Sequence, residues 1–410
     1  MKMMFKMGTA AVLMSFTLDE ETFNSKVDRE TAFIMGTATV MMSFTLDQKT
    51  FNSKEAHELY QSLPNVCFEG KFKLQEVFDC GERGDKLITA TSDNGSHVVI
   101  HLYHFAYLTV DITFVVDNVD QLKPLSEPFS DKYISEVEKK VVNHLWTFIK
   151  ASNSLLCPIR RGPHVTWRYA YSGDNRLQER DYEEIVFETD SKWQNIKIAK
   201  SREFGNVLLL DDVVMLGESD LVYTETLLGI GRNEFKDKTV LILGGGDGGV
   251  LHELLKMSPA YVLMAEIDEE VIKACNKHMK RVCGKTLEKL DGANFKIKIC
   301  DCVLELKEAL NTGTAYDYVI NDLTEDIVDS EKHSFEHQFK TSSKVLELSM
   351  KILKSGGKYL ARGDCLSARY DINRFEEDVR TLGYDFTRTD VHVPSFLETY
   401  CVYEVPKKII

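Results

Sequence analysis

The chain has 410 residues, more than one ordinary domain requires, and its length predicts two or three domains. Apolar residues make up 43% and charged residues 28%, as in a globular protein, and no apolar run reaches the roughly 18–20 residues that a membrane span needs. The formal net charge of −14 argues against a nucleic-acid partner, because phosphates would be repelled, and is compatible with a cationic substrate.

The sequence opens with an internal repeat, in which Met7–Lys26 returns nearly unchanged as Met35–Lys54. Two copies are too few for a solenoid array. Only the second copy continues into a predicted amphipathic helix, Lys54–Leu63. We therefore interpret residues 1–34 as a duplicated extension.

The first residues are only loosely similar to a secretory signal. Lys2 and Lys6 precede the apolar run Met7–Phe16, but that run lacks a small-x-small cleavage site and leads into acidic residues. The nine cysteines have no regular spacing, which predicts neither a disulfide framework nor a metal site. We expect a cytoplasmic protein.

Residues 35–152 are predicted to form an α+β domain. Apolar alternation over Phe72–Phe78 and Val98–Val115 is typical of strands, and a helix is expected from Asp131 to about Lys150. The stretch that follows, 153–166, contains Pro158 and Pro163 and is predicted to be a linker.

The rest of the chain changes from short β segments to βαβ alternation. Residues 167–225 are predicted to form a small antiparallel β domain. Residues 226–410 are predicted to form an α/β, Rossmann-like, doubly wound domain. Its expected parallel strands are Thr239–Leu243, Tyr261–Glu266, Phe295–Ile299 and Tyr316–Ile320.

A glycine-rich turn follows the first of these strands. Gly244, Gly246 and Gly249 satisfy G-x-G-x-x-G between a predicted strand and a predicted helix, the context in which this motif binds nucleotides. Glu266 ends the next strand about twenty residues later, where an acidic side chain can accept hydrogen bonds from ribose hydroxyls. The motif predicts a nucleoside site.

Asp247, inside this turn, indicates which nucleoside. A carboxylate here would repel the pyrophosphate of a dinucleotide, which binds at a helix N-terminus, but it would suit a sulfonium or ammonium. Asp247 therefore favours S-adenosylmethionine or a relative over NAD. The alternative is that Asp247 only caps the helix.

Two further carboxylates follow predicted strands. Asp301 comes after the third strand, where it suits an adenine amino group, and Asp322 comes after the fourth. Many methyltransferases carry an Asn/Asp-Pro-Pro-aromatic motif at the latter position. Here the text is Asn-Asp-Leu-Thr without proline, which weakens a methyltransferase interpretation.

These motifs, taken in order, resemble the polyamine synthases, or aminopropyltransferases. The segments are VLILGGGDGGVL, AEID, CDC and INDLT, and the similarity to the spermine-forming branch rests on INDLT, DLVYTETLLG, WQNIKI and VPSFLE. The resemblance extends from about Trp167 to the C-terminus and implies a methyltransferase-type catalytic fold. It implies that the N-terminal domain resembles S-adenosylmethionine decarboxylase and makes a homodimer contact.

The resemblance also implies roles for individual residues. Asp322 would accept a proton, and Asp247 would join it in catalysis; Tyr223, Asp247, Phe396 and Glu398 would contact spermidine. Phe396 stands where the family usually has tyrosine. The nucleoside would be held by Gln194, Glu266, Asp301, Cys302, Gly244 and Gly246.

The implied reaction is displacement at the aminopropyl carbon of decarboxylated S-adenosylmethionine, a co-substrate, and needs neither cofactor nor metal. An alkylammonium with a pKa near 10 must first lose its proton, and a carboxylate with an ordinary pKa is a poor acceptor for it. We therefore expect Asp322 mainly to orient the amine, within an acidic channel that has few basic residues nearby in sequence. The alternatives are spermidine or thermospermine synthesis, a methyltransferase, and a non-catalytic nucleoside-binding dimerisation protein.

Overall fold

The computed structural model describes residues 36–68, 72–80, 84–116, 130–149, 158–161, 168–172, 174, 176–323 and 335–408. The chain divides into two compact units, Met1–Thr166 and Trp167–Ile410. The predicted extension, residues 1–34, lies outside the described residues.

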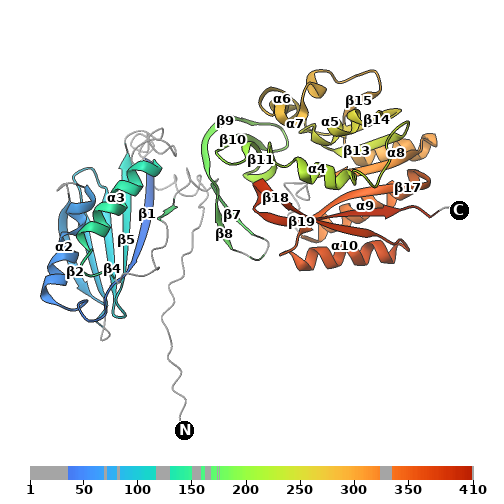
Figure 1. Cartoon of the computed structure of the whole chain (residues 1–410). Helices are drawn as coiled ribbons and strands as arrows, with labels where there is room; N and C mark the ends of the chain where they lie inside the picture. The colour runs from blue at the N-terminus through green and yellow to red at the C-terminus, as the bar shows by residue number, and fades with distance from the viewer. Residues whose placement is uncertain are drawn as a thin grey trace, which may run out of the picture. The chain divides into compact units, whose positions relative to one another are not determined.

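The described part of the first unit is an antiparallel sheet with two helices, α2 and α3 (Figure 1). The strand order is β2-β3-β4-β5-β1-β6, and α2 packs against α3. Alternate residues of β4 are buried, as expected where one face of a sheet is covered. The elements are β1 (Gly36–Thr45), α2 (Lys54–Phe68), β2 (Lys73–Asp79), β3 (Lys86–Thr91), β4 (His97–Tyr103), β5 (Tyr107–Val116), α3 (Asp131–His144) and β6 (Ile159–Arg161).

The α+β prediction for this unit is confirmed in its secondary structure, but the linker prediction for 153–166 is wrong in part. Ile159–Arg161 forms β6 and pairs with β1, with Arg160 opposite Val40. Arg161 also forms an ion pair with Asp111 of β5. The two prolines nearby suggested a linker, and three residues are too short a strand to be recognised from alternation.

The second unit contains a seven-stranded sheet in the order β15-β14-β13-β16-β17-β19-β18. Strands β13 to β17 run parallel to one another, and β19 runs antiparallel to both β17 and β18. The bounds are β13 (Thr239–Gly244), β14 (Tyr261–Glu266), β15 (Phe295–Ile299), β16 (Tyr316–Asp322), β17 (Leu353–Cys365), β18 (Thr387–Val393) and β19 (Glu398–Pro406). This arrangement confirms the predicted Rossmann-like fold.

Helices cover both faces of this sheet. On one face the core contains residues of α4 (Leu221–Leu228), α5 (Gly249–Lys256), α6 (Glu269–His278) and α7 (Lys280–Cys283). On the other it contains residues of α8 (Cys302–Thr312), α9 (Phe335–Ile352) and α10 (Arg369–Thr381). The chain order reverses between adjacent β13 and β16, and ligands of doubly wound sheets bind at such a switch point.

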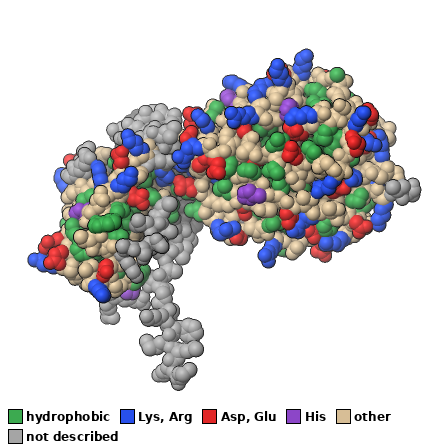
Figure 2. Space-filling view, in the orientation of Figure 1, with side chains coloured by type: hydrophobic (Ala, Val, Ile, Leu, Met, Phe, Trp, Pro, Cys, Tyr) green, Lys and Arg blue, Asp and Glu red, His purple; other side chains and the backbone are tan. Residues whose placement is uncertain are grey.

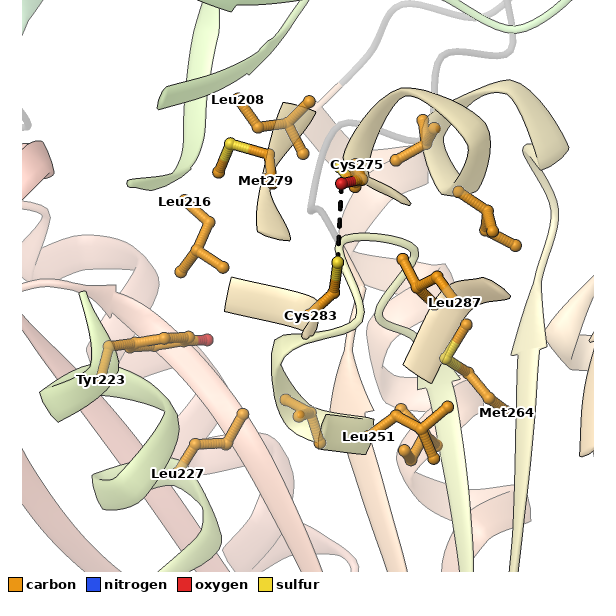
Figure 3. Packing of buried hydrophobic residues seen from close by; sticks show 14 of the residues in the cluster. Leu208, Leu216, Tyr223, Leu227, Leu251, Met264, Cys275, Met279, Cys283 and Leu287 are labelled. Carbon is orange, nitrogen blue, oxygen red and sulfur yellow. Dashed lines mark hydrogen bonds between the residues drawn. The ribbon is translucent and has the colours of Figure 1, made fainter. Parts of the chain in front are cut away.

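A smaller antiparallel sheet packs on the α4 face. Its order is β12-β11-β10-β9, and a β7–β8 hairpin precedes it. Its residues Leu208 and Leu216 share one core with Tyr223, Leu251 and Met264, as Figure 3 shows. The small sheet therefore lacks a core of its own. The strands are β7 (Tyr169–Tyr171), β8 (Leu177–Glu179), β9 (Tyr182–Asp190), β10 (Asn195–Ser201), β11 (Gly205–Leu210) and β12 (Val213–Gly217).

The same core contains two cysteines of the α6–α7 region. Cys283 donates through its thiol to the carbonyl oxygen of Cys275 at 3.5 Å, the contact drawn in Figure 3. Both side chains are buried, and all eight cysteines in the described part of the chain are free thiols.

The described surface is charged and mixed in sign. Figure 2 shows acidic and basic side chains interspersed over the visible face of the second unit. Among the described residues, no helix is long and apolar enough to cross a membrane.

Candidate active site

The glycine-rich turn has a backbone that requires glycine. Gly244 ends β13 with φ of 78°, in the left-handed region, and a Cβ there would lie 2.7 Å from the main-chain oxygen of Asp322. At Gly246 a Cβ would lie 2.9 Å from Oε2 of Glu266. The turn therefore brings this backbone close to two of the predicted site residues, the main chain of Asp322 and the carboxylate of Glu266.

Glu266, at the end of β14, holds this turn in place. Its Oε2 accepts from the backbone N–H of Gly246 at 3.0 Å, and its Oε1 accepts from the N–H of Asp268 at 2.8 Å. Burial raises the pKa of Glu266 to about 7. Each carboxylate oxygen has a second lone pair, so ribose hydroxyls can still donate to Glu266.

Gln194 lies beside the same edge through Asp268. Its Nε2 donates to Oδ2 of Asp268 at 3.1 Å, and the Ser191 hydroxyl donates to the same oxygen at 2.6 Å. Trp193 donates through Nε1 to the Ile267 carbonyl at 3.1 Å. These bonds join the β9–β10 turn to the end of β14.

The sequence interpretation did not single out Asp268. It is 2% exposed and caps α6 by accepting from the Glu270 N–H at 3.0 Å. An aspartate just before a predicted helix is an N-cap signal, which could have identified it.

Asp301 and Cys302 lie where the next strand of the sheet ends. Asp301 caps α8 by accepting from the Val303 N–H at 2.8 Å, and it remains half-buried. Burial raises the pKa of Cys302 to about 12, so its sulfur remains a thiol at neutral pH. Glu266 pairs with Ile299 across the two strands, so the predicted nucleoside residues meet along one edge of the sheet.

Asp247 and Asp322 form a second group at the switch point. Asp322 is opposite Gly244 in the register of β16 and β13, and Asp247 accepts from the Gly249 N–H at 2.7 Å. The bond satisfies the N–H of the first residue of α5, whose N-cap residue is Gly248. Tyr223 of α4, 3% exposed, donates to Oδ1 of Asp322 at 3.4 Å.

Burial and mutual repulsion change the proton affinity of this acidic pair. Burial first, and then the negative charge of Asp247, hold the pKa of Asp322 well above its ordinary value. Burial also raises the pKa of Asp247. Asp322 is thus a better match for the proton of an ammonium than an ordinary carboxylate.

Glu398 and Phe396 lie at the start of β19. Glu398 accepts from the Ser367 hydroxyl at 2.6 Å, and its charge acts on Tyr400. Phe396 is buried against Tyr400, with ring centroids 4.9 Å apart. Leu397 between them has φ of 59°, a left-handed conformation that is uncommon for leucine and typical of functional segments.

A buried network fixes this segment. Asp220 is 1% exposed and accepts from the backbone N–H of Ser395 at 2.9 Å and of Gly217 at 2.7 Å. Arg180 donates to the Ser395 carbonyl at 2.8 Å. The network connects the small sheet to the Pro394–Phe396 turn, a connection that spacing along the chain does not indicate.

Few basic residues are near these acidic residues in the sequence, but the fold brings one close to them. Arg362 of β17 lies close enough to lower the pKa of both Asp247 and Asp322 from the values that burial gives them. Its guanidinium is 5.7 Å from the ring centroid of Phe396. Arg362 is 40 or more residues from every predicted acidic site residue except Glu398, so only the sheet brings it there.

Comparison with protein families connects this geometry to known proteins. Residues 220–409 match the model of the spermine/spermidine synthase domain, and residues 166–218 match the spermidine synthase tetramerisation domain. Residues 166–409 belong to the polyamine synthase family. The resemblance inferred from the sequence motifs is thereby confirmed at the level of the family.

Individual polyamine synthases match over part of their length. A polyamine aminopropyltransferase of Hamiltonella defensa is 29% identical over 46% of this chain and 62% of its own. One from Bacillus cytotoxicus is 34% identical over 33% of this chain and 48% of its own. The matches therefore span less than two thirds of these relatives. The crystal structure of spermidine synthase from Thermotoga maritima aligns over 59% of this chain and 80% of its own, at 24% identity and a TM-score of 0.47.

Among the described residues, no cluster of three or more His, Cys, Asp or Glu side chains is arranged to hold a metal ion.

Proposed function

We propose that the second unit is an aminopropyltransferase that uses decarboxylated S-adenosylmethionine as donor and spermidine as acceptor, with spermine and methylthioadenosine as products. The observation that carries the proposal is the pair of half-buried carboxylates, Asp247 and Asp322, at the switch point beside the glycine-rich turn. Membership of the polyamine synthase family and relatives named polyamine aminopropyltransferase support it.

The reaction forms one C–N bond and breaks one C–S bond. A neutral primary amine of spermidine attacks the aminopropyl carbon bonded to the sulfonium, and the sulfur leaves as the thioether of methylthioadenosine. The amine proton passes to Asp322, whose raised pKa suits it to the task. Asp247 would help to hold the cationic ends of donor and acceptor in line, and this positioning supplies much of the acceleration.

The nucleoside would lie along the ends of β13, β14 and β15. Glu266 would accept from the ribose hydroxyls, and Asp301 would accept from the adenine amino group. Gln194 and Cys302 would border the base and ribose. The fixed positions of Gln194 and Glu266, both bonded to the Asp268 segment, support this arrangement.

The choice of spermidine over putrescine rests on Glu398. Spermidine has one more cationic nitrogen, and a carboxylate away from the reacting amine can select for it. The charge of Glu398 affects the pKa of Tyr400 and of Arg180, whereas the pKa of Asp322 is affected by Asp247 and Tyr223. The carboxylates thus form two groups, Glu398 in one and Asp247 with Asp322 in the other. Two separate groups suit a long acceptor that carries more than one cationic nitrogen.

Arg362 favours one second candidate, an S-adenosylmethionine-dependent methyltransferase. Such an enzyme must bind the methionine carboxylate, and a guanidinium near Asp247 could pair with it. The missing proline motif after β16 argues against this candidate.

One assay tests these alternatives together. Purified protein is incubated with decarboxylated S-adenosylmethionine or S-adenosylmethionine, and with putrescine or spermidine, and the products are separated by chromatography. Spermine from the decarboxylated donor is the expected product. Spermidine from putrescine would indicate spermidine synthase, thermospermine would correct the regiochemistry, and methylated amine would support the methyltransferase.

We also propose that the first unit resembles S-adenosylmethionine decarboxylase and supports a homodimer, and that the enzyme acts in the cytoplasm. An α+β unit outside the matched residues supports the first idea, and the free thiols support the second. Light scattering at micromolar concentration should report a dimer. A tetramer would instead point to residues 166–218, whose family is described as a tetramerisation domain.

A further inference from the structure

Arg362 occupies a defined place beside Asp322 in the central sheet. Ile320 of β16 is opposite Leu360 of β17, and both side chains belong to the core on the α4 face. Side chains alternate along a strand, so residues two positions after Ile320 and Leu360 lie on the same face of the sheet. These residues are Asp322 and Arg362, which are therefore side by side on neighbouring strands. The geometry puts one cation next to the proposed proton acceptor.

Two aromatic rings lie near the guanidinium of Arg362. It lies 5.7 Å from the ring centroid of Phe396 and 5.6 Å from that of Tyr400, and Arg362 is only half-buried. Both distances are within the range of a cation–π contact. The rings and the strand therefore keep the positive charge close to the acceptor side of the site.

Groups from several elements share this environment. The groups whose charge interacts with Arg362, Asp247 or Asp322 include Tyr223 of α4, Glu266 of β14, Tyr400 of β19, and the Cys275 and Cys283 thiols. Further around, Arg180, Asp364 and Glu398 act on Tyr400. Carboxylates thus dominate the site, and Arg362 is the cation that opposes them at its centre.

Such a charge balance has a chemical consequence for a bound amine. Carboxylates stabilise the ammonium form, which binds well but has no lone pair for attack. A nearby cation favours the neutral amine, as it does for catalytic lysines beside a second cation. At a separation of roughly 6 Å and an effective dielectric constant of about 20, one positive charge lowers an amine pKa by about one to two units.

We propose that Arg362 lowers the proton affinity of the acceptor amine held by Asp247 and Asp322, so that the amine reacts as a free base near neutral pH. The inference rests on the proposed aminopropyl transfer and deepens it. Arg362 is a positioning residue in this account, because it acts through the field at the amine and forms no bond to the reacting atoms.

The test compares Arg362→Gln with Arg362→Lys in the full-length protein. The dependence of kcat on pH from 6 to 10 reports ionisations in the enzyme–substrate complex. The rising limb of Arg362→Gln should move up by about one unit, with kcat about tenfold lower at pH 7 and near the wild-type value above about pH 9. Arg362→Lys, which keeps the charge, should leave the limb close to its wild-type position.

Binding gives a readout that does not need turnover. Calorimetry with spermidine, in the presence of methylthioadenosine at pH 7, should show about tenfold tighter binding to Arg362→Gln, because the ammonium is no longer repelled. The same titration in buffers of different ionisation enthalpy should show that spermidine binding releases fewer protons in Arg362→Gln than in the wild type. If Arg362→Gln does not fold, Arg362→Met retains a long stem against Phe396 and Tyr400 and replaces it.

The outcomes separate the two proposals. An active wild type whose kcat limb does not move in the uncharged variant overturns this inference and leaves the proposed function standing. The inference is also overturned if Arg362→Gln has a higher KM for the amine than the wild type at every pH. It is overturned as well if Arg362→Gln binds S-adenosylmethionine more weakly but binds spermidine as the wild type does. A wild type without transfer activity at any pH overturns the proposed function and the inference together.

Discussion

Tyr223 and Asp322, 99 residues apart in the chain, are joined by a hydrogen bond of 3.4 Å in which the phenol hydroxyl donates to Oδ1. The bond connects α4 to the end of β16, and it lowers the pKa of Asp322 from the value that burial alone would set. Burial also holds the pKa of Tyr223 well above its ordinary value, so the phenol stays protonated and remains a donor.

Asp322→Asn should reduce kcat about 100-fold or more, because the amide keeps the shape of the side chain but cannot accept the amine proton. Affinity for methylthioadenosine, measured by calorimetry, should change little. Tyr223→Phe is the matched control: it retains the carboxylate and removes only the donor, and should lower kcat less. Near-normal turnover in Asp322→Asn would remove Asp322 from the mechanism.

Asp322→Asn should become more stable relative to the wild type as the pH rises. The folded pKa of Asp322 lies above its unfolded value, so its contribution to stability is present at low pH and is lost as the pH rises through the folded pKa. Asparagine does not ionise. The difference in Tm between Asp322→Asn and wild type should therefore be more positive at pH 8 than at pH 5, and a pH-independent difference would contradict the buried charge.

Nucleoside affinity should depend on pH through Glu266. The pKa of Glu266 is raised to about 7, so its side chain is mainly ionised above pH 7 and mainly protonated below it. The ionised carboxylate is the form that accepts two hydrogen bonds from ribose hydroxyls. Calorimetry with methylthioadenosine should show affinity increasing from pH 6 to pH 8. Glu266→Gln should bind more weakly and lose this dependence; if the variant keeps it, another group is responsible.

Glu398→Gln should impair spermidine use more than putrescine use. A hydrogen bond to a charged group contributes roughly 1.5–3 kcal/mol, so kcat/KM for spermidine should fall about ten- to a hundredfold. Ser367→Ala, which removes the 2.6 Å donor to Glu398 but keeps its charge, is the matched control and should have a smaller effect. Equal losses for both amines would mean that Glu398 does not select the acceptor.

Deleting residues 1–34 should leave activity and the amount of protein recovered in solution unchanged. The repeat provides the reason, since only its second copy continues into the helix predicted from the sequence at Lys54–Leu63. Activity assays and size-exclusion chromatography of the shortened and full-length chains check this. Loss of either property would assign a structural role to the first copy.

Local sequence pattern was enough to place the predicted nucleoside residues at one edge of the sheet. Parallel strands end at one edge of a sheet, so residues that directly follow predicted strands are expected to lie at that edge. This applies both to the glycine-rich turn and to the carboxylates after the strands. Glu266 and Asp301 were therefore found from local pattern alone. The family motifs extended this to Gln194 and Cys302, but their chemical roles stay predictions.

The electrostatics around Asp322, by contrast, depend on tertiary contacts. Arg362 reaches Asp322 through the pairing of β16 with β17, and Asp220 fixes the Phe396 segment through contacts 175 residues apart. A pKa depends on burial and on charges from every neighbouring element, and spacing along the chain encodes neither. For the same reason β6 and the shared core of the small sheet were missed: pairing and packing are long-range properties of the folded chain.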